Sequence, residues 1–201
     1  MTSKATNENA LDIYLVANLT DSVDRLRYTY KTHEKAASRY QRYEAFRKWA
    51  LIIFTVLAAG SFIASIFALA GHEAAGTVIV GLVATLATFA SFLGDYLDYP
   101  DRQQEHHIAG AKARSLFVRY EDLLSDYLAG AIASSEARRL RDDLQEATDQ
   151  LLLTVPRTTR SDYKEAEAAI ENDERTSVAQ EAALQVLLPL QPHQNNAEVE
   201  G

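Results

Sequence analysis

The polar side chains whose type and spacing most clearly suggest a function are small hydroxyls inside two otherwise apolar segments. These segments cover residues 49–71 and 74–94 and contain no Asp, Glu, Lys, Arg or His. On helices, the two serines of the first segment lie one turn apart, and a glycine and two threonines of the second share one face. Such faces let helices approach closely, or they line a narrow, weakly polar pore. Close packing is the simpler interpretation, and the candidate pore-lining residues are Ser61, Ser65, Gly81, Thr85 and Thr88.

Three aspartates, at positions 95, 98 and 101, follow the second segment. In an oligomer they would form an acidic ring at the mouth of a pore, which would favour cations. The alternative is ordinary solvation together with helix capping around Pro100, because proline is tolerated in the first turn of a helix. The candidate pore-mouth residues are Asp95 and Asp98.

Recognisable catalytic and metal-binding motifs are absent from the sequence. There is no cysteine, no H-E-x-x-H pattern, no phosphate-binding glycine loop and no nucleophile elbow. The single histidine cluster, Glu105-His106-His107, places adjacent side chains about 100° apart on a helix and lacks a third ligand nearby. We therefore expect no catalytic, cofactor-binding or metal-binding residues, no cofactor and no enzyme activity.

The two apolar segments have the length and composition of membrane-spanning helices. As helices they would be roughly 34 and 31 Å long, close to the roughly 30 Å of a hydrocarbon core. A buried hairpin in a soluble helical protein is the alternative, but so short a chain could hardly cover two helices that are apolar on every side. Aromatic and basic residues beside the segments are typical of a membrane interface, and the candidate anchors are Tyr43, Phe46, Arg47, Lys48, Trp49, Tyr96 and Tyr99.

Charge predicts the orientation of this hairpin. Lys and Arg gather before the first segment and after the second, whereas the connecting loop has neither. Basic residues near membrane ends favour the cytoplasm, so we expect a multi-pass protein with both termini cytoplasmic. The net charge of −8 over 201 residues comes mainly from the C-terminal half, which argues against nucleic-acid binding.

Outside the membrane segments, the sequence predicts amphipathic helices. A heptad seam typical of a coiled coil runs through Leu19, Val23, Leu26, Tyr30, His33, Ala37 and Tyr40. A helix at about 101–128 carries a stripe made of Ile108, Ala111, Leu116, Tyr120, Leu123, Leu124 and Tyr127, and another follows at about 135–154 with Leu140, Leu144, Ala147 and Leu151. These faces must be buried within one subunit or between subunits, and both arrangements stay open.

The predicted fold class is all-α, a two-helix transmembrane hairpin with a cytoplasmic helical bundle formed by the N- and C-terminal helices. The predicted segments are a disordered N-terminus at 1–9, a cytoplasmic amphipathic helix at 10–48, transmembrane helices at 49–71 and 77–97, a short loop at 72–76, a cytoplasmic helical region at 100–188, and a disordered tail at 189–201.

The arrangement resembles the SLATT family, the SMODS and SLOG-associating two-transmembrane effector domains of bacterial conflict systems. The features that carry the resemblance are the basic, aromatic helix RYQRYEAFRKW at 39–49, the short connection GHEAAG at 71–76, and the helix HHIAGAKARSLFVRYEDLL at 106–124. The resemblance implies a pore-forming effector of the bacterial inner membrane that acts in anti-phage defence. It also implies a nucleotide second-messenger synthase or nucleotide sensor as a separate partner.

These observations together predict a homo-oligomer that permeabilises or depolarises the inner membrane after a nucleotide signal. The expected partners are the lipid bilayer, further copies of the chain, and that synthase or sensor, with no nucleic acid. The alternative is a non-enzymatic membrane anchor or scaffold that recruits a partner through its cytoplasmic helices.

Overall fold

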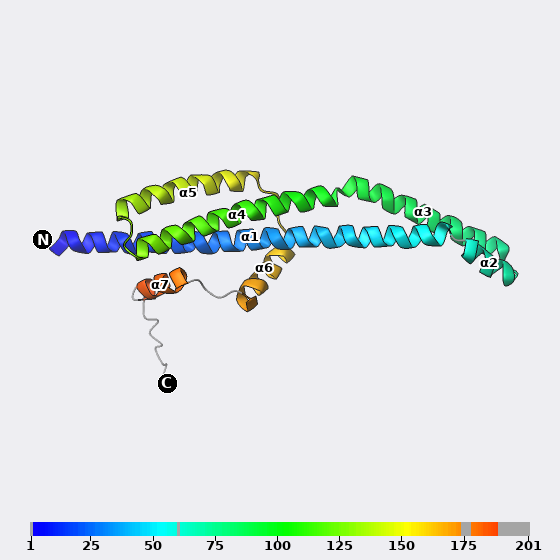
Figure 1. Cartoon of the computed structure of the whole chain (residues 1–201), viewed down its shortest axis with the longest axis horizontal. Coiled ribbons are helices and arrows are strands. Elements are labelled where there is room, and N and C mark those ends of the chain that lie inside the picture. Colours follow the sequence, from blue (N-terminus) through cyan, green and yellow to red (C-terminus); the bar gives the residue numbers. More distant parts are fainter. Residues whose placement is uncertain (1, 60, 174–177, 189–201) are drawn as a thin grey trace, which may run out of the picture. The chain divides into compact units, whose positions relative to one another are not determined.

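The described part of the chain is helical. The computed structural model describes residues 2–59, 61–173 and 178–188, and side chains for 12–57, 65–72, 74–94, 96–172 and 180–188; within these residues there is no strand. In chain order the helices are α1 (Thr2–Ala59), α2 (Ser61–Leu69), α3 (Glu73–Leu97), α4 (Tyr99–Leu128), α5 (Ser134–Thr154), α6 (Arg160–Asp173) and α7 (Val178–Leu187) (Figure 1). The predicted all-α class is confirmed.

The helices form two compact units. One is a helical bundle made of Met1–His33 and Ile108–Gly201, and the other is a helical hairpin made of Glu34–His107. Helices α1 and α4 each contribute residues to both units. From here on, the bundle and the hairpin refer to these two sets of residues.

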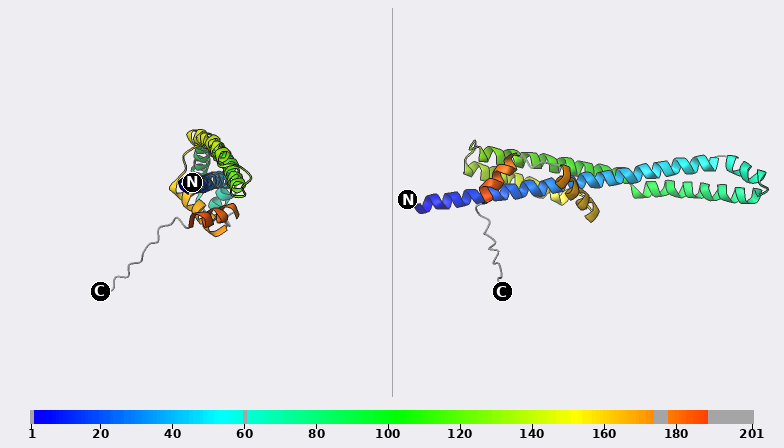
Figure 2. Two further views of the ribbon diagram at one scale, coloured as in Figure 1. Left: turned by 90° about the vertical axis from the view of Figure 1, so that its left-hand side faces the viewer. Right: turned by 90° about the horizontal axis from the view of Figure 1, so that it is seen from below.

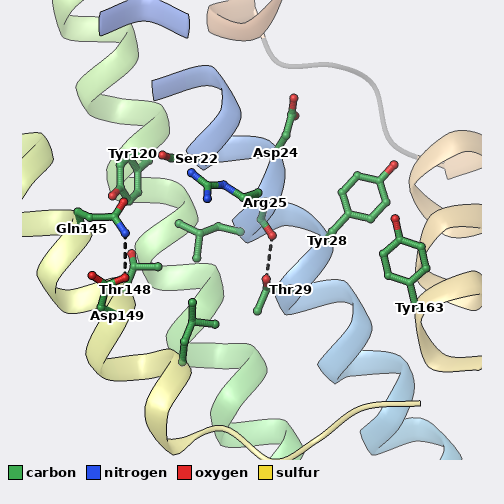
Figure 3. Close-up of a pocket in the computed structure, with 12 residues that line it drawn as sticks. Ser22, Asp24, Arg25, Tyr28, Thr29, Tyr120, Gln145, Thr148, Asp149 and Tyr163 are labelled. Carbon is green, nitrogen blue, oxygen red and sulfur yellow. Dashed lines mark hydrogen bonds between the residues drawn. The ribbon is translucent and has the colours of Figure 1, made fainter. Parts of the chain in front are cut away.

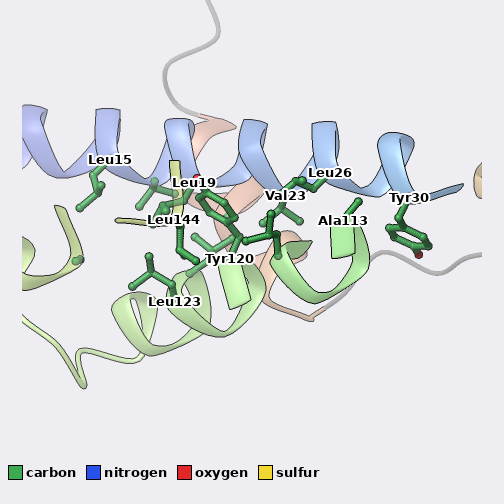
Figure 4. Close-up of a cluster of buried hydrophobic side chains, with 14 of the residues drawn as sticks. Leu15, Leu19, Val23, Leu26, Tyr30, Ala113, Tyr120, Leu123 and Leu144 are labelled. Atoms are coloured by element: carbon green, nitrogen blue, oxygen red, sulfur yellow. The ribbon is translucent and has the colours of Figure 1, made fainter. Parts of the chain in front are cut away.

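The bundle has one hydrophobic core, to which helices far apart in the sequence contribute. Figure 4 shows side chains of α1 packed against those of α4 and α5, with Tyr120 among them. The heptad seam of α1 supplies Leu19, Val23, Leu26 and Tyr30 to this core, none of them more than 7% exposed. The part of the seam that lies in the bundle therefore packs within one chain.

The buried stripe of α4 differs from the predicted one at its beginning. Ile108 is 43% exposed, and Ala111 is also exposed, whereas Ala109 and Ala113 are buried. The prediction was wrong there because it followed the larger side chain at 108. The buried positions instead continue the spacing of three and four residues back from Leu116, which small alanines satisfy because they allow neighbouring helices to approach.

Local signals end and begin the bundle helices. After α4, the N–H groups of Gly130 and Ala131 donate to the carbonyls of Tyr127 and Asp126, and Gly130 has a φ of 71°. This is the Schellman arrangement that a glycine after a helix favours. Helix α6 begins one residue before the predicted Ser161-Asp162 pair, since its cap is Thr159, whose hydroxyl and backbone N–H both donate to the Asp162 carboxylate.

The hairpin turns sharply between α2 and α3, which pack against each other (Figure 2). The N–H groups of Gly71 and His72 donate to the carbonyls of Ala68 and Phe67, and Gly71 adopts a φ of 77°. The turn is tighter than the loop predicted at 72–76, because α3 already begins at Glu73. Glycine makes this turn possible, since its missing side chain permits a positive φ.

The membrane-spanning criteria are met by a single stretch of the described residues, Ala74–Leu128, which is long and apolar enough to cross a bilayer. The first apolar segment is divided between the end of α1 and α2, on either side of residue 60, which lies outside the described residues. The structure therefore contains a helical hairpin, and the crossing of a membrane by both arms stays a prediction.

The two ends of the chain were both predicted to be disordered. Helix α1 begins at Thr2, so its first turns fall in the segment 1–9 that the sequence predicts to be disordered. Extending a helix that already exists costs little compared with starting one, because each added residue gains a hydrogen bond. The predicted tail at 189–201 lies outside the described residues.

Candidate functional site

The candidate pore-lining face of α3 is turned away from the other arm of the hairpin. Gly81, Thr85 and Thr88 are exposed. A different stripe of α3 is buried or half-buried at spacings of three and four residues, and it consists of Gly76, Val80, Val83, Ala87, Ala90 and Gly94. The small hydroxyl face is therefore not used for packing within the hairpin, and it is free for another copy of the chain or for a pore.

The threonine hydroxyls on this face are partly occupied by their own helix. Thr85 Oγ1 donates to the Gly81 carbonyl at 2.9 Å, and Thr88 Oγ1 donates to the Ala84 carbonyl at 3.0 Å. Each hydroxyl oxygen keeps lone pairs that face outward, so the face presents weak acceptors. In the first segment Ser65 is exposed, and the side chain of Ser61 lies outside the described ones.

The candidate pore-mouth residues lie where α3 meets α4. Asp98 is exposed and sits between the two helices with a φ of 45°, in the left-handed region that aspartate tolerates better than most residues. Its carbonyl accepts from the N–H of Arg102, which joins the first turn of α4. Asp98 thus makes the helix break predicted beside Pro100, and the side chain of Asp95 lies outside the described ones.

Most candidate interface anchors are exposed, as membrane-surface residues would be. Trp49 is 64% exposed, Phe46 77% and Tyr96 84%. Tyr99 instead lies in a ring cluster, 5.8 Å from Tyr43 between ring centroids. The guanidinium of Arg47, another candidate anchor, is directed to a neighbouring carboxylate.

That carboxylate belongs to Glu44, which is only 7% exposed. Arg47 Nε and Nη2 donate to its two oxygens at 2.8 and 2.7 Å, and Lys48 Nζ lies 3.3 Å from Glu44 Oε1. The hydrogen bond from Arg47 lowers the pKa of Glu44 below its ordinary value of 4.5, against the opposing effect of burial.

His106, for which the sequence predicts no metal-binding role, is buried in the hairpin. It is 1% exposed and stacks on Tyr40, with ring centroids 5.5 Å apart and an interplanar angle of 21°. The guanidinium carbon of Arg39 lies 4.5 Å from the centroid of the Tyr40 ring. The α4 stripe contained the signal, because His106 lies three residues before the buried Ala109.

The bundle contains a pocket of about 510 Å³ between α1, α4, α5 and α6. Figure 3 shows Ser22, Tyr120, Gln145 and Thr148 on one side of it and the Tyr28 and Tyr163 rings on the other. The two rings are stacked, with centroids 5.6 Å apart and an interplanar angle of 18°. This volume lies in the range of small-molecule sites.

The pocket includes one buried phenol, that of Tyr120. Tyr120 is fully buried, and its Oη has no hydrogen-bond partner among the described atoms. The neighbouring Ser22 and Thr148 hydroxyls donate instead to carbonyls of their own helices, at 2.9 and 2.8 Å. Burial raises the pKa of Tyr120, so this phenol remains a neutral donor.

The charges around the pocket are unsuited to a phosphate. Asp24 and Asp149 line it, and its single lining cation, Arg25, pairs with Asp21 at 2.9 Å. Burial, and then the neighbouring Tyr163 and acidic side chains, raise the pKa of Tyr28. A phosphate would need uncompensated cations or free helix N-terminal amides, so the pocket suits an uncharged molecule better.

A buried polar contact attaches α7 to α1. Gln180 accepts from Arg27 Nη2 at 2.5 Å and donates to Asp24 Oδ1 at 2.7 Å, and Gln180 is 2% exposed. Arg27 also lies over the Phe117 ring, 5.6 Å from its centroid. Burial raises the pKa of Asp24, with Arg27 and Gln180 opposing that shift. No local pattern predicted this contact, because its partners are far apart in the chain.

A family comparison decides what this arrangement is. The model of the SMODS and SLOG-associating 2TM effector domain family 4 matches residues 15–182, which include the hairpin and nearly all of the described bundle. The chain belongs to this SLATT family. No curated protein and no solved structure matches the chain. Its family is thus one of effector domains with two transmembrane segments, and the resemblance carried by the boundary helices and the short turn is confirmed.

Within the described residues, no group of three or more His, Asp or Glu side chains could hold a metal ion.

Proposed function

We propose that this chain is a homo-oligomeric, non-enzymatic effector that opens a pore in the bacterial inner membrane and depolarises the cell after a nucleotide signal. One observation carries the membrane part of the proposal. Large apolar side chains on the hairpin are open to the surroundings, with Val56 65%, Val78 70% and Phe92 68% exposed. Such a surface is stable only against lipid or another apolar partner.

Both arms of the hairpin would cross the bilayer. The first arm is formed by the end of α1 with α2 and the second by α3, and the turn at Gly71 would lie on the far side. The basic residues that precede the first arm and follow the second would hold both termini in the cytoplasm. The bundle would then lie in the cytoplasm.

A conducting path requires several copies, since two helices cannot enclose one. The face with Gly81, Thr85 and Thr88 supports this step, because it is exposed and opposite the stripe that packs inside the hairpin. Several such faces around an axis would give a narrow, weakly polar pore. Asp98, exposed at the end of α3, would then contribute negative charge at its mouth.

The signal would reach this chain through another protein. The bundle pocket carries carboxylates and a paired arginine, which disfavour a phosphorylated ligand. A nucleotide synthase or sensor that docks on the bundle would transmit the signal instead, and the family description names SMODS and SLOG partners.

A membrane anchor or scaffold is the second candidate. The exposed apolar hairpin would serve an anchor equally well, and the bundle could bind a partner without any pore. The two functions differ in one measurable property, because a scaffold does not change the membrane potential.

The test is the membrane potential of bacteria during controlled expression, followed with a potential-sensitive dye. We expect depolarisation by the wild type and its loss in the Thr85→Leu/Thr88→Leu variant, in which bulk narrows and dries the path. The control is Leu82→Met/Leu86→Met. These two positions also lie one turn apart, but on another face of α3, and the substitution keeps the side-chain volume nearly constant. Oligomer size is measured for each variant, and unchanged depolarisation by an assembled Thr85→Leu/Thr88→Leu protein would exclude this face.

Topology is tested separately with reporters fused after residue 201 and within 72–76. A reporter active only in the cytoplasm should work at the C-terminus and fail in the turn. Activity of that reporter within the turn would contradict the proposed orientation.

A further inference from the structure

The two arms of the hairpin meet at a point where a charged side chain lies against a glycine. Gly94 of α3 is buried, and a Cβ built on it would overlap the guanidinium of Arg47 on α1. At Gly81, by contrast, a Cβ would meet no atom within 4 Å. One glycine of α3 is thus required for a close approach, and the other is not.

The guanidinium is not free to move aside. A long side chain can usually swing away from an added methyl group at little cost. Arg47, however, donates two parallel hydrogen bonds to Glu44, and its side chain is 21% exposed while that of Glu44 is 9% exposed. A displaced Arg47 would leave a buried carboxylate with Lys48 as its remaining cation in this group.

We infer that Glu44, Arg47 and Gly94 form a boundary clamp, in which the fixed guanidinium of Arg47 sets how closely the two arms approach at the base of the hairpin. Arg47 is a positioning residue in this role, acting through the arms rather than on a permeating ion. The clamp lies immediately before the first apolar segment and at the end of the second, where the arms would enter the membrane. The inference goes beyond the proposed function, because it holds whether or not the hairpin conducts.

The geometry explains why arginine is needed here. Its planar fork satisfies both oxygens of one carboxylate and still presents a flat surface to the glycine backbone. Lysine would keep the charge but lose the second parallel bond, so it would not hold a fixed position over Gly94. The distance between the two arms at the base of the hairpin would then vary over a wider range.

The experiment measures that base distance directly in the full chain. The sequence has no cysteine, so single cysteines at the exposed positions Phe46 and Tyr96 can carry spin labels without further changes. The labelled chain is diluted with unlabelled chain in lipid nanodiscs, and pulsed electron paramagnetic resonance gives the distance distribution between the arms. A circular dichroism melt of each variant checks that the helices remain folded.

We expect Gly94→Ala to broaden the distance distribution and to shift it to longer distances, whereas Gly81→Ala leaves it unchanged. Arg47→Met, which removes the guanidinium but keeps an apolar stem, should broaden it as well, and Arg47→Lys should not restore it. The decisive variant is Gly94→Ala combined with Arg47→Met, in which the added methyl meets no guanidinium and should cause no further change beyond Arg47→Met alone.

Two results would overturn the clamp. One is a Gly94→Ala distribution that matches Gly81→Ala, and the other is an effect of Gly94→Ala that is equally large with and without the guanidinium. The proposed pore function is judged by depolarisation alone, so its failure leaves the distance measurements intact, and a failed clamp leaves the depolarisation result intact.

Discussion

The bundle and the hairpin contain the same kinds of apolar residue, but the bundle buries them and the hairpin leaves them exposed. In the bundle, Leu19 and Leu124 are 0% exposed and are covered by other helices of the chain. In the hairpin, Leu82 is 60% and Leu69 89% exposed. The chain thus completes one core by itself and leaves the other apolar surface for a surrounding that it does not supply. For a family of two-transmembrane effectors, lipid is the natural surrounding.

The bundle and the hairpin also differ in where their polar groups lie. The bundle buries a charged group between helices, since the guanidinium of Arg27 donates to the buried amide of Gln180. The hairpin has ionisable residues at its base, where Glu44 and Arg47 pair, and at its turn, where His72 and Glu73 lie. The apolar segments between these two ends carry only hydroxyls as polar side chains. This division matches the high cost of isolated charges in hydrocarbon.

The largest expected effect separates the two kinds of apolar surface. Leu124→Ala should lower the free energy of unfolding by about 2–5 kcal/mol, because it leaves a cavity in a closed core. Leu82→Ala should change it by less than about 0.5 kcal/mol in detergent, because that side chain has no protein core around it. Denaturant unfolding of the full chain followed by circular dichroism measures both, and equal losses would contradict the comparison.

A smaller effect is expected from the buried polar contact of the bundle. Gln180→Ala should destabilise the bundle by about 1–3 kcal/mol, since it leaves the buried guanidinium of Arg27 without the amide oxygen that accepts its hydrogen bond. Gln150→Ala is the matched control, because that side chain is exposed and reaches only Glu146 at 3.4 Å. The same unfolding measurement applies, and a neutral Gln180→Ala would show that α7 is not held by this contact.

The cap of α6 should contribute less. Thr159→Ala removes a hydroxyl that donates to Asp162 at 2.7 Å, and we expect a loss of about 1 kcal/mol. Thr158→Ala, one residue earlier and exposed, should have no measurable effect. If the two variants unfold at the same denaturant concentration, the cap makes no net contribution to the bundle.

The smallest expected effect is a pH dependence confined to the hairpin. Arg47 lowers the pKa of Glu44 in the folded state, so its stabilisation is fully present above the ordinary value of 4.5 and is lost as the pH falls through the lower, folded value. The spin-label distribution at the base should therefore broaden below pH 4.5 in the wild type. The distance distribution of Glu44→Gln should be broad already at neutral pH and should not change with acid. A wild-type distribution that stays narrow down to complete acid unfolding would contradict this.

Local sequence signals predicted most helices and their ends. Pro100 and Gly130 marked a helix start and a helix end that the structure contains, because their backbone preferences act over a few residues. The heptad seam correctly identified the buried face of α1 within the bundle. The length and composition of the two apolar segments also predicted two apolar helices, although the turn between them is tighter than the predicted loop.

The candidate site was predictable in composition but not in orientation. The hydroxyl face of α3 followed from helical spacing alone, yet only the structure places it opposite the packed stripe of the hairpin. The sequence predicts Arg47 as an interface anchor, because its type and position match a membrane boundary. Its pairing with Glu44 over Gly94 depends on where the second arm lies, which no local pattern contains.

By itself, the sequence determined that this chain is helical, that two segments are apolar on every side, and that charge is kept out of them. These properties depend on residue type and on periods of a few residues. Only the tertiary structure decided that the part of the seam in the bundle packs within the chain, that His106 is buried against Tyr40, and that Gln180 joins Asp24 and Arg27. Such contacts link residues as many as 156 positions apart, and their energies depend on the mutual placement of whole helices rather than on any one helix.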